Sequence, residues 1–300
     1  MNIDLMRECI LCPRECKVDR TREKAGYCRM NMDLVVARAA LHMWEEPCIS
    51  GEEGSGTVFF SGCSLGCVYC QNHNIAKGYA GKKITIERLS DIFLELQEKQ
   101  ANNINLVTPS HYVPQIIDAI ILARGKGLTL PIVYNCSSYE KVETLRLLEG
   151  YVDIYLPDLK YMDTEAAVLY SNAKDYFVYA SCAIEEMVRQ VGAAEFNARG
   201  IMTKGVIVRH LLLPGYLSDS KNIIHYLYNT YSDTIYISIM NQYTPLQGMS
   251  AYPSMNRRVS EEEYEELIDY AIDIGVENGF IQEGETASES FIPEFNDEGV

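Results

Sequence analysis

The middle of the chain alternates short apolar runs with longer amphipathic stretches. Apolar residues recur at helical spacing after Thr85, at Leu89, Ile92, Phe93 and Leu96, which predicts an amphipathic helix. We predict further helices that begin near residues 113, 139, 164 and 218, the third of these reaching about residue 192 in two pieces, and strands at residues 57–60, 103–107, 131–135, 152–156, 205–213 and 234–240. Near-continuous apolar strands separated by helices indicate an α/β fold in which helices cover a parallel sheet.

The two ends of the chain follow other patterns. Residues 1–50 are rich in cysteine and show little regular periodicity, whereas residues 246–300 hold one helix and an acidic, irregular tail. Ser260 and Glu263 have the spacing of a capping box, so we expect that helix to begin there. We therefore divide the chain into a cysteine-rich metal-binding extension at 1–50, an α/β body at 51–245 and a C-terminal helix and tail at 246–300.

Composition and charge narrow the classes of function. The chain has 300 residues, of which 47% are hydrophobic, so it can bury a full core. Its formal net charge of −16 argues against broad binding to nucleic acid. We find neither a run close to the ~20 apolar residues of a membrane span nor a secretory signal. Ten cysteines, most in tight clusters, favour metal-binding thiols in the cytoplasm over disulfides.

One loop carries the most specific chemistry. Cys63, Cys67 and Cys70 follow the first predicted strand and a glycine, with the spacing C-x3-C-x2-C. Three thiolates on so short a loop are one ligand short of an ordinary four-cysteine iron–sulfur cluster, which leaves one iron free for a non-protein ligand. The alternative is a zinc site to which His73 contributes.

This loop, with Tyr69 just before its last cysteine, closely resembles the cluster loop of radical S-adenosylmethionine (SAM) enzymes. The resemblance implies a partial (β/α)6 barrel and a 4Fe–4S cluster whose open iron binds the amino and carboxylate groups of SAM. It also implies that one electron from the cluster cleaves SAM to methionine and a 5′-deoxyadenosyl radical, and that Tyr69 packs near the adenine. The radical chemistry then belongs to the cofactor, while the protein positions it.

A second group of cysteines lies near the N-terminus, at Cys9, Cys12, Cys16 and Cys28. The surrounding segment looks loop-like, and a segment this short folds better around a metal. The spacing fits a four-cysteine zinc site and an auxiliary iron–sulfur cluster equally well. We expect the isolated Cys136 and Cys182 to be small core residues.

Further motifs extend the resemblance over nearly the whole chain, at residues 9–16, 54–63, 108–112, 209–215 and 278–284. Together with the N-terminal cysteines they resemble the pyruvate formate-lyase activating enzyme-like subfamily of radical SAM proteins. Ligands of such barrels bind at the C-terminal ends of the strands. The residues at those ends are therefore the candidates for the SAM site.

Asp158 and Lys160 follow the fourth predicted strand and resemble an Asp-x-Lys motif that lines the SAM pocket of activating enzymes. Lys160 would neutralise the SAM carboxylate, and Asp158 would bind a cation or orient Lys160. The alternative is that the two form only a surface ion pair. The same resemblance makes Arg209 a contact for the carboxylate or the ribose, for which its forked guanidinium is suited. His210 faces the other side of the strand and is expected to be structural.

Four weaker candidates complete the predicted site. Ser110 and His111 follow the second strand, where the superfamily has a Gly-Gly-Glu-like element whose backbone contacts the SAM amino group. Asn135 ends the third strand. Gln242 follows the sixth strand, near the point where activating enzymes have a SAM-binding histidine.

We therefore expect a radical SAM enzyme that abstracts hydrogen from a protein or small molecule, with activation of a glycyl-radical enzyme as one version. An electron donor such as flavodoxin or ferredoxin would reduce the cluster. One alternative is modification of a peptide, a metabolite or RNA with the help of an auxiliary cluster. The other is a non-catalytic metal-binding protein that docks a partner.

Overall fold

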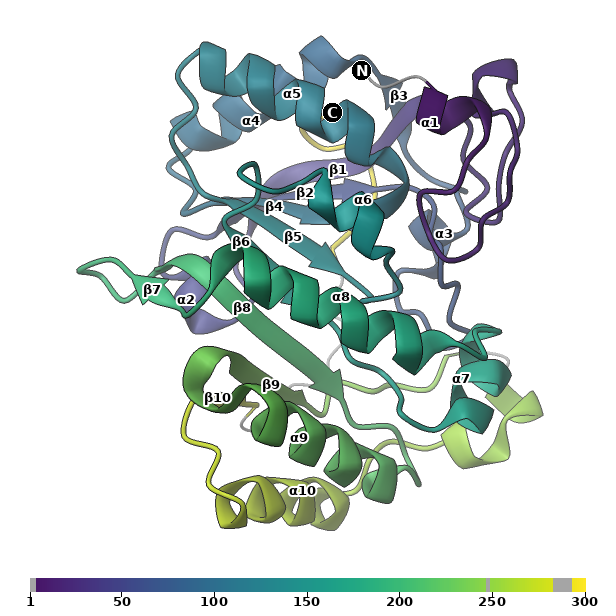
Figure 1. The fold of residues 1–300 in the computed structure, drawn as a ribbon, viewed down its shortest axis with the longest axis vertical. Helices are drawn as coiled ribbons and strands as arrows, with labels where there is room; N and C mark the ends of the chain where they lie inside the picture. The colour runs from purple at the N-terminus through teal and green to yellow at the C-terminus, as the bar shows by residue number, and fades with distance from the viewer. Residues whose placement is uncertain (1–3, 247–248, 283–292) are drawn as a thin grey trace.

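The computed structural model describes residues 4–246, 249–282 and 293–300. Their central element is a ten-stranded sheet in the order β10-β9-β8-β6-β5-β4-β2-β1-β3, with β7 (Glu195–Phe196) paired to β8 off this path (Figure 1). All neighbours from β2 to β10 run parallel, namely β2 (Ser55–Phe60), β4 (Ile104–Val107), β5 (Ile132–Cys136), β6 (Ile154–Pro157), β8 (Met202–Leu211), β9 (Tyr236–Met240) and β10 (Gly279–Ile281). The predicted α/β fold class is confirmed.

Helices follow the strands as the hydrophobic pattern predicted. They are α4 (Ile86–Glu98), α5 (Val113–Gly125), α6 (Val142–Arg146), α7 (Thr164–Ser171), α8 (Tyr176–Val191) and α9 (Leu217–Tyr231). Thr85 caps α4 by accepting a hydrogen bond from the backbone of Arg88. The expected capping box of Ser260 and Glu263 is present at the start of α10 (Glu261–Asp273).

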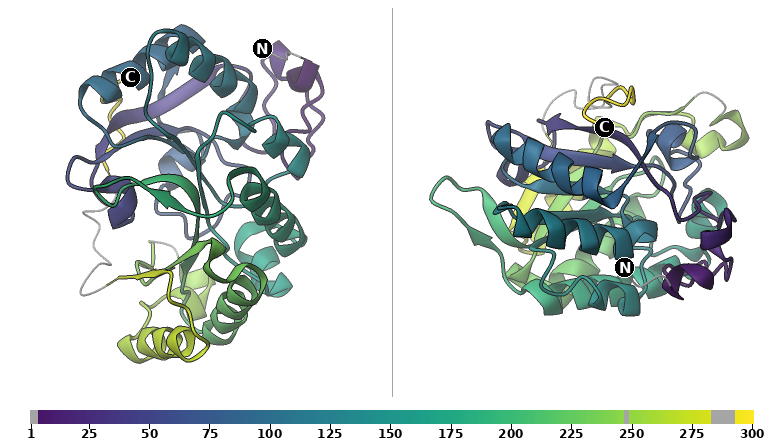
Figure 2. Two further views of the ribbon diagram at one scale, coloured as in Figure 1. Left: turned by 60° about the vertical axis from the view of Figure 1, so that its left-hand side comes forward. Right: turned by 90° about the horizontal axis from the view of Figure 1, so that it is seen from above.

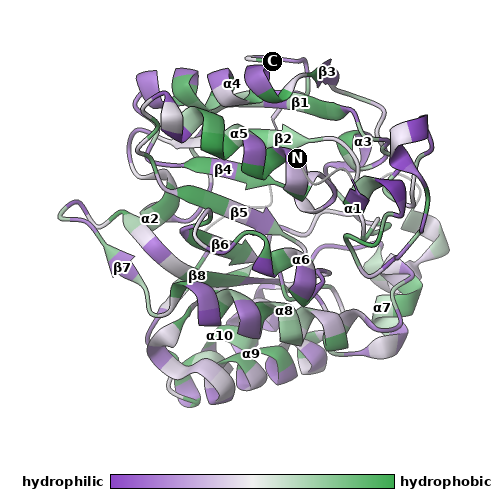
Figure 3. Ribbon diagram, turned by 45° about the horizontal axis from the view of Figure 1, so that its top comes forward, coloured by the Kyte–Doolittle hydropathy of each residue, from purple (hydrophilic) through white to green (hydrophobic). Residues whose placement is uncertain are grey.

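Hydrophobic residues concentrate on the strands and on the helix faces turned toward them (Figure 3). The central parallel strands β2, β5 and β6 are buried at every position. This burial on both faces explains why the strands read as apolar runs without alternation. In the part of the chain that the structure describes, no helix is long and apolar enough to cross a bilayer.

Several elements were not predicted. β1 (Leu34–His42) pairs antiparallel with β2 and with the edge strand β3 (Lys82–Ile84), so residues of the cysteine-rich region contribute a strand to the main sheet. Its alanines and Arg38 weaken the β-propensity of the run. The last described residues, 293–300, pack beside β1, where the carbonyl of Glu298 accepts from the amide of Ala39 at 2.8 Å (Figure 2).

The short elements α1 (Asp4–Arg7), α2 (Pro47–Ser50) and α3 (His73–Ala76) were also missed. Two asparagines just before β4 donate hydrogen bonds to α2. This places α2 at the N-terminal ends of the parallel strands. Asn102 donates to the carbonyl of Ser50 at 2.7 Å, and Asn103 to that of Ile49 at 2.8 Å. The segment from β1 to α2 therefore closes one end of the sheet, opposite the cysteine loop that follows β2.

Candidate functional site

A cavity of about 520 Å³ lies inside the curve of the sheet. Phe59 and Phe60 of β2 line it from one side, and Ser238 of β9 and Phe280 of β10 line it from the other. These strands lie far apart in the strand order, so the sheet must curve to bring them to one cavity. The volume is typical of a pocket for a nucleoside-sized ligand.

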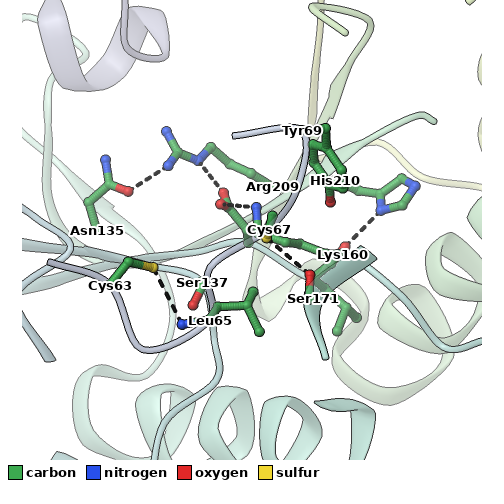
Figure 4. A network of polar contacts seen from close by, with 12 residues as sticks. Cys63, Leu65, Cys67, Tyr69, Asn135, Ser137, Lys160, Ser171, Arg209 and His210 are labelled. Carbon is green, nitrogen blue, oxygen red and sulfur yellow. Dashed lines mark hydrogen bonds and ion pairs between the residues drawn. The ribbon is translucent and has the colours of Figure 1, made fainter. Parts of the chain in front are cut away.

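Cys63, Cys67 and Cys70 all line this cavity from the loop after β2. The Sγ of Cys63 accepts from the amide of Leu65 at 3.4 Å, and the Sγ of Cys67 accepts from the hydroxyl of Ser171 at 3.1 Å (Figure 4). Both bonds would persist with thiolates, and N–H···S and O–H···S bonds are among the contacts that set the potential of iron–sulfur clusters.

Gly62 lets the loop turn directly after β2. Its φ is +90°, and a Cβ on it would approach the carbonyl of Cys28 to 2.7 Å. A side chain at this position would therefore be strained by its backbone and would also collide with the N-terminal segment.

A chain of charged side chains crosses the cavity beside the cysteine loop. Lys160 donates to Asp158 at 2.8 Å, and the Nε of Arg209 donates to the other oxygen of Asp158 at 3.0 Å. Arg209 also donates to Asn135 at 2.6 Å and to Glu45 at 3.0 Å. Asp158 and Arg209 are brought together by the backbone, because they form a parallel bridge just beyond β6.

The pKa values of Asp158 and Lys160 show that these neighbouring opposite charges stabilise one another. Burial alone would raise the pKa of Asp158, but Lys160 and Arg209 together hold it below its usual value. Burial opposes the charge of Lys160, yet Asp158 and the nearby Cys67 raise its pKa above the usual value. Both residues are therefore ionised at neutral pH.

Tyr69 is buried within the cysteine loop and lines the cavity. Its hydroxyl accepts from Tyr161 at 2.6 Å, and its ring lies 6.0 Å from that of Tyr243 in an edge contact. Gln242 lines the cavity, and its carbonyl accepts from Gln71 at 3.0 Å. These contacts hold the loop against the end of β9.

The other predicted site residues lie in different places. Ser110 lines the cavity and donates to Glu140, whose pKa burial raises to about 7. His111 does not line it, because its ring nitrogen contacts the carbonyl of Ser61 at 2.7 Å behind the cysteine loop. His210 faces away and contacts the carbonyl of Leu159 at 2.7 Å and the hydroxyl of Ser220 at 2.8 Å (Figure 4).

Sequence reasoning missed the residues at the end of β1 and just after it. His42, Trp44, Glu45 and Glu46 all line the cavity. The one signal in the sequence was a pair of glutamates beside the single tryptophan of the chain, between an apolar run and a proline. That signal does not say which strand the glutamates meet, because their partners are distant in the sequence.

The four N-terminal cysteines lie in one region. Cys9, Cys12 and Cys28 are buried and Cys16 is half-buried. Burial raises the pKa of the Cys12 thiol, with smaller contributions from Cys28 and Cys9. Within residues 4–246, 249–282 and 293–300, no three His, Cys, Asp or Glu side chains lie as they would around a single metal ion. Of the two isolated cysteines, Cys136 is buried as expected, but Cys182 is exposed because it lies on the outer face of α8.

Comparison with known proteins identifies the family. The model of the radical SAM superfamily matches residues 57–227, which is more than half of the chain. The chain belongs to the radical SAM superfamily. It is therefore assigned to a superfamily of enzymes that use a 4Fe–4S cluster and SAM.

A curated relative, the "uncharacterized protein MJ0674" of Methanocaldococcus jannaschii, is 28% identical over 89% of this chain and 75% of its own length. Among solved structures, SuiB of Streptococcus suis bound to S-adenosylmethionine has a TM-score of 0.52 at 12% identity, over 76% of this chain and 52% of SuiB. The FeFe-hydrogenase maturase HydG has a TM-score of 0.52 at 16% identity, with the same coverage of both chains. The present chain thus spans about half the length of these solved structures, and the likeness shows the fold alone.

Proposed function

We propose that Cys63, Cys67 and Cys70 hold the 4Fe–4S cluster, and that the cavity beside them binds SAM. The observation that supports this best is that all three cysteines and the Lys160–Asp158–Arg209 chain line one cavity. When bound, the cluster supplies the electron that cleaves SAM, and SAM supplies the 5′-deoxyadenosyl radical that abstracts hydrogen. The donor set fits, because three thiolates leave one iron open, and a cluster spaces its cysteines more widely than a single ion does.

Each side chain of the cavity then has a separate task. Lys160 binds the carboxylate of SAM as a cation that Asp158 orients at 2.8 Å. Tyr69 covers the adenine, while Ser110, Asn135 and Gln242 supply polar contacts from neighbouring strand ends. All three nitrogens of Arg209 already donate to protein side chains, so we assign Arg209 mainly to positioning Asp158.

The test is anaerobic reconstitution with iron and sulfide, followed by reduction in the presence of SAM. We expect 5′-deoxyadenosine from the wild type and none above background from Cys67→Ala. Cys182→Ala is the matched control, because Cys182 is exposed and lies on α8, away from the cavity. Intact SAM in the wild-type reaction, with the cluster present and reduced, would refute the proposal.

For the hydrogen donor we propose a protein or peptide. The Asp158-x-Lys160 motif and the subfamily resemblance support activation of a glycyl-radical enzyme. Modification of a peptide is the second candidate, supported by likeness in fold to SuiB bound to its precursor peptide SuiA, with a TM-score of 0.51. Deuterium transfer from a labelled partner protein into 5′-deoxyadenosine would separate these from a small-molecule substrate. We further propose a cytoplasmic flavodoxin or ferredoxin as the electron donor.

We also propose that Cys9, Cys12, Cys16 and Cys28 bind a second metal, either one zinc ion or an auxiliary cluster. Clustering of the four thiols in one short, irregular segment supports this site. About four irons per chain with one zinc would favour zinc, and about eight irons would favour a second cluster. Replacing Cys12 and Cys28 by serine should remove the second metal and leave the iron of the barrel.

A further inference from the structure

The floor of the cavity is made by the segment between β1 and α2, opposite the cysteine loop. Glu45 reaches up from it and is fully paired. One of its oxygens accepts from Arg209 at 3.0 Å, and the other accepts from Asn105 at 2.9 Å. This segment thereby places a carboxylate inside the cavity, at the N-terminal ends of the parallel strands.

Glu46 differs from its neighbour because it forms no ion pair with a lysine or arginine among the described residues. It is only 8% exposed and lines the cavity, and its Oε2 has no hydrogen-bond partner among the described residues. The hydroxyl of Ser238 acts on the carboxylate but carries no charge. The charge of Arg209 also acts on Glu46, but the hydrogen bonds of its three nitrogens go to Asp158, Glu45 and Asn135.

The charges along the cavity are therefore unequal. Among its described lining residues, the three carboxylates Glu45, Glu46 and Asp158 face the two cations Lys160 and Arg209. His42 adds no positive charge, because burial lowers its pKa to about 4. Burial raises the pKa of Glu46 although the charge of Arg209 lowers it, so the carboxylate is compensated only in part. A cationic ligand beside it would reduce the remaining cost of burying its charge.

The walls next to Glu46 indicate what surrounds such a cation. Phe59, Trp44 and Phe280 line the same cavity. Aromatic and apolar walls with one acidic group suit an ammonium on an apolar stem, because the stem packs against the rings while the charge meets the carboxylate.

We propose that Glu46 is a specificity residue that binds a protonated amine of the substrate at the floor of the cavity. This rests on the proposed function, since it takes the cavity to be the active site. SAM also carries an ammonium group, so the test must separate a substrate amine from SAM itself.

The test uses anaerobically reconstituted enzyme and two probes of equal shape, 2-phenylethylammonium and 2-phenylethanol, in calorimetric titrations with and without saturating SAM. We expect the wild type to bind the ammonium roughly tenfold or more tightly than the alcohol, and Glu46→Gln to lose that preference. Glu52→Gln is the matched control and should keep it, because Glu52 is exposed and does not line the cavity. SAM affinity is measured on every variant to show that the site is folded.

Three results would overturn the inference. They are equal or absent binding of both probes by the wild type, a preference that survives in Glu46→Gln, and a loss of SAM affinity in Glu46→Gln with the preference intact. The last would assign Glu46 to SAM. Because binding is read without SAM cleavage, absence of 5′-deoxyadenosine would refute the proposed function and leave this measurement standing.

Discussion

The two groups of cysteines in this chain are held in very different ways. Cys63, Cys67 and Cys70 lie on a loop that leaves β2 and is fastened by backbone bonds to its neighbours. The amide of Val68 donates to the carbonyl of Tyr170 at 2.8 Å, and the amide of Gly62 to that of Ile75 at 2.8 Å. Regular structure on both sides therefore positions this loop.

The N-terminal group has little regular structure around it. Among the described residues up to Cys28 there is only the four-residue α1 and one three-residue 3-10 helix. Glu15, Lys17 and Glu23 have positive φ, which is unfavourable for residues with a Cβ. A segment of this kind needs tertiary contacts or a bound metal to hold its shape.

Arg14 joins the two groups. It lies between Cys12 and Cys16, and it donates to the carbonyls of Ser64 at 2.9 Å and Leu65 at 3.1 Å in the cysteine loop. It also donates to the carbonyls of Ser171 and Asn172 at the end of α7, and its guanidinium lies 3.9 Å from the ring centre of Tyr27. The comparison teaches that regular structure positions the cysteine loop after β2. The N-terminal cysteine segment is instead held against that loop by a long side chain, Arg14.

The largest expected effect is confined to the barrel. Arg209→Ala leaves the buried Glu45 without its cation, so we expect a loss of about 3–5 kcal/mol in the free energy of unfolding. Anaerobic denaturation of the metal-free protein measures this. The metal content of an N-terminal site should not change, and a parallel loss of that metal would break the distinction between the two regions. Arg209→Lys keeps a positive charge but not the forked guanidinium, so its free energy of unfolding should fall between those of the wild type and Arg209→Ala.

Arg14→Ala tests the link itself. It removes a guanidinium from four carbonyls, so we expect a loss of about 2–3 kcal/mol together with weaker retention of iron by the barrel loop. Iron retained after gel filtration, followed with the electron paramagnetic resonance of the reduced cluster, provides the measurement. Arg22→Ala is the control, because the side chain of Arg22 is 80% exposed. If both variants retain iron equally, the two regions are independent.

Glu140 underlies the N-terminal segment and gives a pH-dependent test. Its pKa is raised by burial to about 7, above the usual value of 4.5. A raised acid pKa means that its contribution to stability is complete below about pH 4.5 and is lost as the pH rises through 7. Between pH 5 and pH 8 the wild type should therefore lose about 2–3 kcal/mol more of its free energy of unfolding than Glu140→Gln loses.

Urea denaturation of the metal-free protein at several pH values checks this prediction. Glu143→Gln is the matched control, since Glu143 is exposed on α6. A wild type whose stability has the same pH profile as that of Glu140→Gln would contradict it.

The smallest effect is expected at the rim between the regions. Lys141 forms an ion pair with Glu15 of the N-terminal segment, but the Glu15 side chain is 41% exposed. Exposed pairs contribute less than ~1 kcal/mol, so Glu15→Gln should change stability within that limit. A much larger loss in thermal melting would show that this rim, and not Arg14, holds the segment.

Local patterns were sufficient for much of the molecule. The apolar runs predicted the parallel strands β2, β4, β5, β6, β8 and β9, but not β3 or β7. Helical spacing predicted the helices from α4 to α10 to within a few residues. The cysteine spacing indicated the superfamily, and strand ends indicated Asp158, Lys160 and Arg209 as neighbours. Each of these features depends on residues that are close in the sequence or on a regular order of strands.

The strands at the two ends of the sheet were beyond such reasoning. β1, next to the edge strand β3, carries alanines and an arginine that lower its strand propensity, and the edge strand β10 has only three residues. Both become strands because a neighbour offers unpaired backbone groups, as β9 does for β10. Likewise, His111 follows a strand end but turns behind the cysteine loop, where the carbonyl of Ser61 meets its ring.

The sequence by itself determined the fold class, the three-cysteine loop and the alternation of strands with helices, because period, propensity and spacing are local properties. Only the tertiary structure decided that Glu45 meets Arg209 across 164 residues and that Arg14 joins two groups of cysteines. It also decided that one oxygen of the buried Glu46 has no hydrogen-bond partner among the described residues. These contacts depend on how a curved sheet is closed at its ends. The closing segments have no periodic pattern, since their side chains are matched to distant partners and not to their neighbours in the chain.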